Sequence, residues 1–201
     1  SQNKVRSVLY ASRGVAEYKF GITTLEGGYD YTHTNRKDFY KNIGSSLPNT
    51  DDKIKEQTVA GFIGVTVPIN KIELYGSLRY EHTYSDYYQR GVLKPEQSHK
   101  YGRLFPSVDF SFPISKAHFT LSYSAKTKRP KYSQLSSSIQ YDDRYTYETG
   151  NPFLKPEIIH DISFAGIYKW VFFSASYQYV HEAILGVVEA YQENEPINLM
   201  T

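Results

Sequence analysis

The residue types that most often carry out chemistry occur in this chain without the spacing that such chemistry needs. The six histidines are His33, His82, His99, His118, His160 and His181. None of them forms a His-x-x-x-His or comparable ligand motif, and the chain has no cysteine to supply a thiolate. Two acidic pairs, Asp51-Asp52 and Asp142-Asp143, lack the pattern of a dedicated calcium-binding loop. We therefore expect no metal site and no cofactor.

A pair of carboxylates could support glycoside hydrolysis, and Glu73 and Glu81 are the obvious candidates. Eight residues along one strand separate them by about 26 Å, because a strand rises about 3.3 Å per residue. Two-carboxylate hydrolysis needs a separation of about 5 to 9.5 Å. A Ser/His/Asp arrangement, a phosphate-binding loop and a nucleotide fingerprint are also missing from the sequence. The sequence predicts a protein that is not an enzyme.

The composition says more about which partners to expect than about whether the protein lies in water or in a membrane. The 201 residues carry a net charge of +2, which gives no reason to expect a nucleic-acid partner. No apolar run approaches the roughly 20 residues of a membrane-spanning helix. A soluble protein and a transmembrane β-barrel both fit this composition, because polar positions facing the lumen of a barrel lower its mean hydropathy.

Alternation of apolar and polar residues recurs along the whole chain and predicts its positioning elements. The alternating segments are Val5–Phe20, Thr24–Asn35, Lys55–Pro68, Lys71–Ser85, Tyr101–Pro113, Ala117–Arg129, Ile158–Trp170 and Val171–Ile184, with a further strand starting within Leu185–Glu193. We expect Gly14 to mark a bulge or bend. Short turns near residues 22, 69, 115 and 170 alternate with long polar loops at 36–55, 86–100 and 129–157. This pattern predicts an all-β, antiparallel up-and-down meander of about eight or nine strands, part of a large transmembrane barrel.

The charged residues on these strands decide which face should meet lipid. The charges that we assign to the lumen are Glu73, Arg79, Glu81, Asp109 and Lys126. A Lys or Arg facing lipid at mid-bilayer costs about 2 to 4 kcal/mol, so the opposite face, with Leu74, Phe110 and Leu121, should face lipid. The alternative is a self-contained soluble β-barrel that binds a small hydrophobic ligand, because reversing the two faces leaves the alternation unchanged.

The segment from Arg129 to Glu157 interrupts the alternation. It contains the turn-forming sequence Gly150-Asn151-Pro152 and two further prolines, Pro130 and Pro156. It also contains four tyrosines that could contact a ligand, which are Tyr132, Tyr141, Tyr145 and Tyr147. We expect this long loop to be extracellular, and we expect its proline and glycine motif to be structural.

The same segment resembles the C-terminal half of TonB-dependent outer-membrane receptors, especially the Bacteroidetes-type outer-membrane β-barrel family. The matching residues are Tyr123, Arg129, Pro130, Tyr132, Gln134, Leu135, Tyr141, Gly150, Asn151, Pro152, Leu154, Pro156 and Glu157. Two shorter patches, Leu104–Ser107 and Gly76–Glu81, resemble the family as well.

The resemblance implies a location in the outer membrane, in contact with its lipid, and a barrel of about 22 strands around a plug. It further implies nutrient import, for example of glycans, peptides or metal chelates, with energy from the TonB complex. Residues 1–201 would then be a single barrel fragment that lacks the plug domain and the terminal strands.

Overall fold

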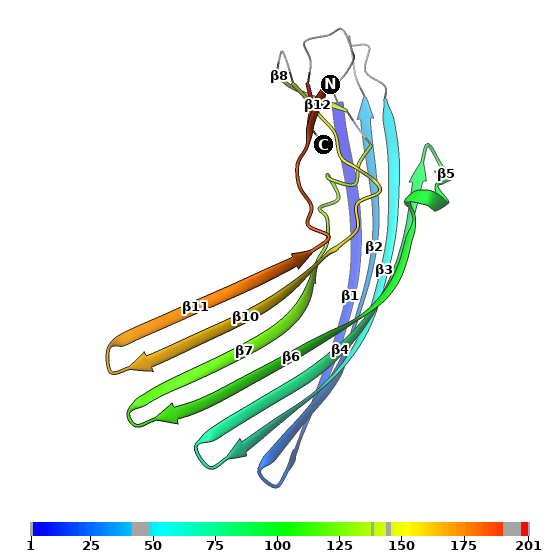
Figure 1. The fold of residues 1–201 in the computed structure, drawn as a ribbon. Helices are drawn as coiled ribbons and strands as arrows, with labels where there is room; N and C mark the ends of the chain where they lie inside the picture. Colours follow the sequence, from blue (N-terminus) through cyan, green and yellow to red (C-terminus); the bar gives the residue numbers. More distant parts are fainter. Residues whose placement is uncertain (1, 42–48, 138, 144–145, 191–197, 201) are drawn as a thin grey trace.

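The computed structural model of the chain describes residues 2–41, 49–137, 139–143, 146–190 and 198–200. Its main element is an antiparallel sheet in which successive strands lie side by side (Figure 1). In spatial order its strands are β1 (Gln2–Phe20), β2 (Thr23–Lys41), β3 (Thr50–Ile69), β4 (Ile72–Gln89), β6 (His99–Ile114), β7 (Ala117–Lys128), β10 (Glu157–Tyr168) and β11 (Val171–His181). The short β5 (Val92–Leu93) pairs with β4 and brings the sheet to nine strands. The predicted meander of eight or nine antiparallel strands is confirmed.

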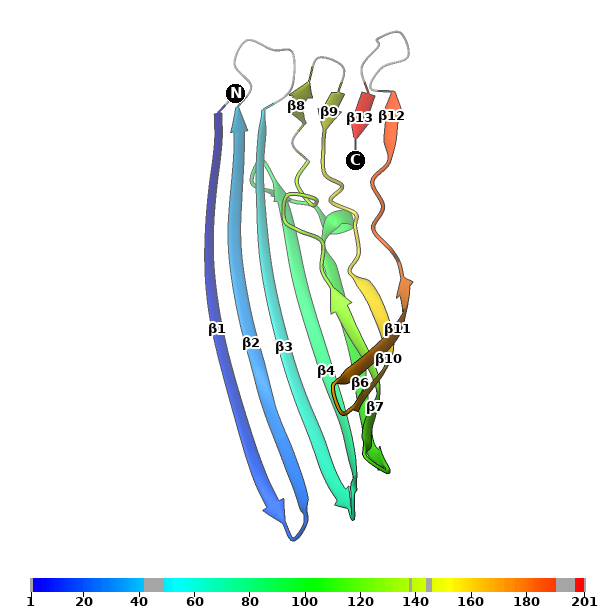
Figure 2. The same cartoon turned by 90° about the vertical axis from the view of Figure 1, so that its left-hand side faces the viewer.

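A second, smaller sheet lies at the long-loop end of the molecule (Figures 1 and 2). Its strands are β8 (Gln140–Asp143), β9 (Thr146–Glu148), β12 (Val188–Ala190) and β13 (Asn198–Met200). One turn of 3-10 helix, η1 (Pro95–Gln97), precedes β6. Among the residues described, no helix is both long enough and apolar enough to cross a membrane.

Four two-residue turns join the strands at the other end of the large sheet. Their first residues, Gly21, Asn70, Ser115 and Lys169, have φ angles of 60°, 58°, 56° and 55°. A positive φ at this position matches the twist of tight hairpin turns to that of the flanking strands. The short turns predicted near residues 22, 69, 115 and 170 are confirmed, and all four lie at one end of the sheet (Figure 1).

The expected loops at 36–55 and 86–100 are wrong at their ends, because the strands run further than the alternation of apolar residues. β2 continues to Lys41, and β3 begins at Thr50, so that Asp38 still pairs with Asp52. The polar side chains in these extensions bind one another, as Arg36 does with Asp38 at 3.0 Å. A stretch that is polar on both faces therefore shows where a strand leaves the apolar zone of the sheet, and the strand continues for several residues beyond that point.

Two stretches that were expected to be irregular are partly regular. Pairing of β1 with β2 runs without a shift from Gln2 to Phe20, so the predicted bulge at Gly14 is absent. The loop 129–157 contains β8 and β9, although the sequence shows no strand periodicity there. These two strands are short and pair outside the main sheet, so they leave too few alternating positions to be recognised.

The register separates the side chains into an outer face and an inner face. On the outer face, Leu74, Phe110 and Leu121 lie opposite one another on β4, β6 and β7. Aromatic rings continue this face, and the rings of Phe119 and Phe164 stack with their centroids 5.6 Å apart. The sheet curves into a trough whose hollow side carries the loop segments (Figures 1 and 2).

The inner face is polar, as the row across Asp30, Ala60, Glu81 and Arg103 illustrates. A soluble barrel that holds a hydrophobic ligand needs the reverse arrangement, with apolar side chains inside and polar ones outside. The alternative of a soluble β-barrel is therefore wrong for this chain, and the apolar outer face is the one suited to lipid.

Neighbouring residues on β7 allow this assignment to be tested. Leu121 is 46% exposed on the outer face, and Ser122 points to the inner face. In protein folded into phospholipid vesicles, we expect Leu121→Lys to lower the free energy of unfolding by about 2 to 4 kcal/mol, because the ammonium group would face hydrocarbon. Ser122→Lys is the matched control and should change it by less than about 1 kcal/mol. Guanidinium titration measures both, and equal losses would contradict the assignment of the faces.

Candidate functional site: the loop folded onto the inner face

The first half of the long loop turns back into the trough and is held there by Arg129. This residue follows β7, and its guanidinium points across the inner face toward β3 and β4. One terminal nitrogen (Nη2) lies 2.5 Å from Oε1 of Glu81, and the other (Nη1) lies 3.6 Å from Oε1 of Glu56. Nη2 also lies 3.4 Å from the hydroxyl of Thr83, which in turn lies 3.1 Å from that of Thr58. One cation therefore joins the loop to two strands of the wall.

A second attachment lies nearer the long-loop end of the sheet, at Asp52 of β3. Its carboxylate is buried and accepts hydrogen bonds from the backbone N–H of Ser137 at 2.8 Å and from the Ser137 hydroxyl at 3.0 Å. The Ser136 hydroxyl donates to the same carboxylate at 3.4 Å. Gln89 of β4 donates its side-chain N–H to the Ser137 hydroxyl at 3.0 Å. Hydrogen bonds to an ionised carboxylate are about twice as strong as neutral ones, so Asp52 fixes this part of the loop firmly.

Tyr132 lies between these two attachments and is only partly exposed. The guanidinium of Arg36 lies over its ring, 5.3 Å from the centroid. Burial raises the pKa of the Tyr132 hydroxyl, which also hydrogen-bonds Thr34. Of the four tyrosines predicted as ligand contacts, this one packs against the wall of the trough.

The other three tyrosines belong to the second part of the loop. Tyr147 is half-buried in β9, where it pairs with Tyr141 of β8. The side chain of Tyr141 and the whole of Tyr145 lie outside the described part of the chain. Ligand contact by these tyrosines stays a prediction.

The second half of the motif docks on the first half. A Cβ atom on Gly150 would lie 2.5 to 2.6 Å from the backbone carbonyl oxygens of Ser133, Gln134 and Ser136, so only glycine fits this contact. The next N–H, that of Asn151, donates to the Gln134 carbonyl at 2.5 Å. The motif that identifies the sequence is thus a self-packed loop whose two ends, distant in the chain, lie against each other.

The remaining motif residues complete this turn. The Asn151 side-chain oxygen accepts from the N–H of Phe153 at 2.9 Å, and the Asn151 carbonyl accepts from the N–H of Leu154 at 3.2 Å. Pro152 and Pro156 are buried, and Pro130 follows Arg129 directly. Each proline restricts the backbone and removes a donor that would otherwise need a partner in the packed loop.

Glu157 closes the motif and connects three segments. Its buried carboxylate accepts from Lys128 at 2.8 Å and from the N–H of Ile184 at 2.7 Å. The end of β7, the start of β10 and the segment after β11 therefore meet at one carboxylate. Arg103 strengthens this junction by donating to the Pro156 carbonyl at 3.3 Å.

The charges predicted for the lumen all lie on the inner face by register, but they do not form one cluster. Arg79 binds Asp30 of β2 and lies 3.3 Å from Glu81, which also binds Arg129. The other three charges, Glu73, Asp109 and Lys126, have no ion pair within 4.0 Å among the described residues.

Sequence reasoning missed Asp30, Glu56 and Asp52, each of which binds one of the predicted residues or the loop. Asp30 and Glu56 occupy inner-face positions of β2 and β3. The alternation of inward and outward positions along these strands could therefore have predicted that both carboxylates face the lumen side. Asp52 lies in the segment that was expected to be a loop, where no such alternation could be assigned. In the part of the chain that is described, no group of three or more His, Cys, Asp or Glu side chains could hold a metal ion.

Residues 11–201 match the model of the outer membrane protein beta-barrel family. The chain belongs to this family. Its location is accordingly the outer membrane, where the apolar outer face of the sheet meets lipid, and both predictions are confirmed at this level. The Bacteroidetes type within the resemblance stays a prediction. No curated protein matches the chain by sequence.

Solved structures show the same fold in larger outer-membrane proteins. The copper transporter OprC is 14% identical with a TM-score of 0.72, and the match covers 99% of this chain and 33% of OprC. The FrpB iron transporter from Neisseria meningitidis is 16% identical with a TM-score of 0.61, covering 98% and 31%. The ferric-catecholate import receptor Fiu from E. coli K12 is 9% identical with a TM-score of 0.60, covering 89% and 31%. The chain thus spans about a third of the length of these structures.

The contacts of Arg129 predict how much the stability of the protein falls when this cation is removed. Arg129→Met leaves Glu81 and Glu56 without their shared partner. The Arg129 side chain is only 30% exposed, so water screens these ion pairs less than it screens pairs at the surface. We therefore expect the free energy of unfolding to fall by about 1.5 to 3 kcal/mol. The double variant Arg129→Met/Glu81→Gln should recover part of this loss. Lys126→Met, three positions before Arg129, is the charge-matched control. A loss no greater than that of the control would show that the ion pairs do not hold the loop.

The contact at Gly150 predicts a local effect. A methyl group there would collide with three backbone carbonyl oxygens, which costs about 1 to 3 kcal/mol. Gly150→Ala should therefore accelerate hydrogen exchange of the Asn151 amide by about 5- to 150-fold. At Gly76 an added Cβ atom would meet nothing within 4 Å, so Gly76→Ala is the control and should leave this exchange rate unchanged. An unchanged rate in Gly150→Ala would mean that the two halves of the motif do not depend on their contact.

Proposed function

We propose that this chain forms part of the wall of a TonB-dependent outer-membrane transporter that takes up a nutrient. The observation that carries the proposal is the loop 129–157, folded onto a polar inner face at the end opposite the short turns. A solute entering from that end meets a surface of charges and hydroxyl groups, and the loop lies across it. The family motif in the loop supports the same function, as does the similarity in fold to OprC, FrpB and Fiu.

The wall belongs, in this proposal, to a larger barrel. β1 and β11 are the two ends of the strand order, and each has one sheet partner among the described strands. An unpaired strand edge is unfavourable in a bilayer, where no water satisfies the backbone groups. Further strands of the same protein would pair with these edges and close the barrel around a plug domain. The TonB complex would supply the energy for transport.

The substrate class is proposed in broad terms. The similar structures are described as a copper transporter, an iron transporter and a ferric-catecholate import receptor. A nutrient such as a metal chelate, a peptide or a glycan fits a lumen face that offers both charges and hydroxyl groups. The proposed activity is transport, without catalysis.

Fixing the loop to the wall tests the proposal. The Ser137 hydroxyl lies 3.0 Å from the Asp52 carboxylate, and the chain contains no cysteine that would interfere. In cells that express the full-length protein, we expect oxidised Asp52→Cys/Ser137→Cys to lose most nutrient uptake, because the loop can no longer leave the lumen. Reduction should restore uptake, as measured with radiolabelled medium components.

Each single cysteine variant serves as a control for the loss of the Asp52–Ser137 hydrogen bonds, and a gel shift verifies the disulfide. Uptake should also disappear in cells without TonB. Full uptake by the oxidised double variant would show that the loop does not gate the path. Uptake that is indifferent to TonB would overturn the proposed energy source.

A further inference from the structure

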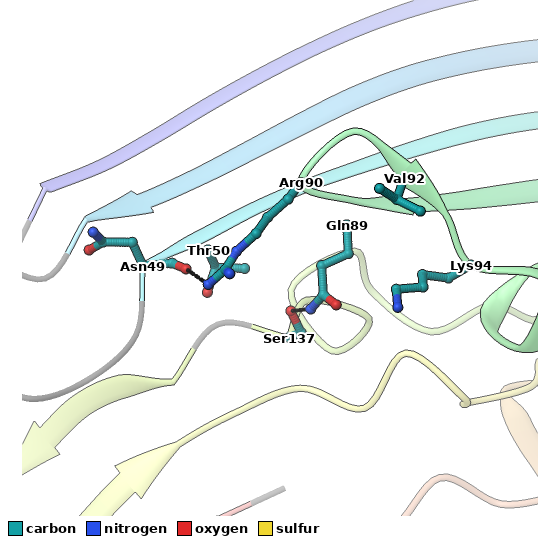
Figure 3. A pocket seen from close by; sticks show the side chains of 7 residues that line it. All are labelled: Asn49, Thr50, Gln89, Arg90, Val92, Lys94 and Ser137. Atoms are coloured by element: carbon teal, nitrogen blue, oxygen red, sulfur yellow. Dashed lines mark hydrogen bonds between the residues drawn. The ribbon is translucent and has the colours of Figure 1, made fainter.

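A cavity of about 460 Å³ lies at the mouth of the trough, between the start of β3, the β4–β5 hairpin and the loop (Figure 3). Two cationic side chains, Arg90 and Lys94, line it from the hairpin side. Val92 lines it as well, and neutral hydrogen-bonding side chains complete the lining, with Thr50 and Gln89 on the inner face and Ser137 on the loop. Binding sites for small molecules have volumes of about 300 to 1,000 Å³, so the cavity is large enough for a small solute.

The cavity is lined by two positive charges and by no negative charge among the described residues. Asp51 and Asp52, which follow Thr50 in the chain, are already engaged, since Asp51 lies 3.4 Å from the ammonium group of Lys37 and Asp52 is bound by the loop serines. Neither Arg90 nor Lys94 has an ion pair within 4.0 Å among the described residues. Two cations that line one cavity without a counter-charge favour an anionic ligand.

The hairpin that carries these cations is held in place by the backbone. The Arg90 N–H donates to the Asp51 carbonyl at 2.7 Å, and the Lys94 N–H donates to the Tyr87 carbonyl at 2.8 Å. The Lys94 carbonyl accepts from the hydroxyl of Ser98 at 2.9 Å. Both side chains therefore extend from anchored positions, which lowers the entropy lost when a ligand binds.

Arg90 is also an unusual residue for its position. It has a φ of 50° and precedes Gly91 at 79°, so the pair forms a tight turn in which Asn-Gly is preferred. An arginine there adopts the left-handed region at some energetic cost. Its guanidinium donates to the Asn49 carbonyl at 3.3 Å, and a guanidinium has five N–H donors in all. The remaining donors can form a bidentate contact with a carboxylate, sulfate or phosphate group.

We propose that this cavity binds the oxyanion group of a small solute at the entrance to the lumen, with Arg90 and Lys94 as the binding cations. Thr50 and Gln89 donate hydrogen bonds to the remaining oxygen atoms. Because Ser137 lines the cavity and binds Asp52, an anion in the cavity lies against the loop at one of its two attachments. This inference deepens the proposed transport function by naming an anionic substrate class, and it rests on that function for its biological role.

Calorimetric titration of the full-length protein in detergent with glucose 6-phosphate tests the site, with methyl glucoside as the neutral probe. We expect glucose 6-phosphate to bind and methyl glucoside to bind at least 10-fold more weakly. Arg90→Gln/Lys94→Gln should weaken binding of the phosphate at least 10-fold, and Arg90→Lys should weaken it less, because it keeps the charge and loses the bidentate geometry. Inorganic phosphate in a competition titration separates recognition of the anion alone from recognition of the sugar.

Lys131→Gln is the control, because it removes an exposed loop cation that does not line the cavity and should leave binding unchanged. The shift in gel mobility on heating verifies that each variant has folded. Equal binding of the charged and neutral probes, or equal binding by the double glutamine variant and the parent, would overturn the site. Binding is measured without TonB, so a failure of this site is distinguishable from a failure of TonB-dependent uptake.

Discussion

Hydrogen bonding between neighbouring strands is the constraint on which the rest of this structure depends. In a bilayer, backbone N–H and C=O groups have no water to bind, so each strand in the membrane needs a partner on both sides. Pairing of β1 with β2 runs unbroken through 19 residues, and the pairing of β2 with β3 is nearly as long. This continuous register decides which side chains share a face. A shift of one residue would exchange the lipid and lumen faces of a whole strand.

The long strands also explain why a loop can be held so firmly inside the trough. β2, β3 and β4 extend beyond the apolar zone and present polar inner-face side chains at the height where the loop turns inward. Ser137 is attached to one of these side chains, Asp52. Arg129 is attached to Glu81 and Glu56, which lie within the alternating segments Lys71–Ser85 and Lys55–Pro68. Removing one partner of such an ion pair leaves the other charge partly buried and unpaired. The free energy that this costs exceeds the free energy that the intact pair contributes. The loop is therefore part of the wall in this state, and movement of the loop must exchange these contacts for others.

Sequence patterns predicted the strands best where a single face is apolar. In Lys71–Ser85 and Tyr101–Pro113, alternation located the strands and assigned Arg79 and Asp109 to the lumen side. The same method failed between residues 36 and 55, because strand residues outside the apolar zone can be polar on both faces. It failed again within 129–157, where β8 and β9 have only four and three residues. Short strands that pair only with one another and with distant segments carry too little local pattern to be predicted.

The sequence by itself determined the alternation, the positions of the tight turns and the family motif, because each depends on residues adjacent or nearly adjacent in the chain. From these follow the all-β meander, the lipid and lumen faces, and the assignment to outer-membrane barrels. Only the tertiary structure decided what the motif does. Gly150 meets the backbone of Ser133 to Ser136, and Arg129 meets Glu81, across separations of 14 to 48 residues. Contacts of that range depend on the register of several strands together, which no local pattern specifies.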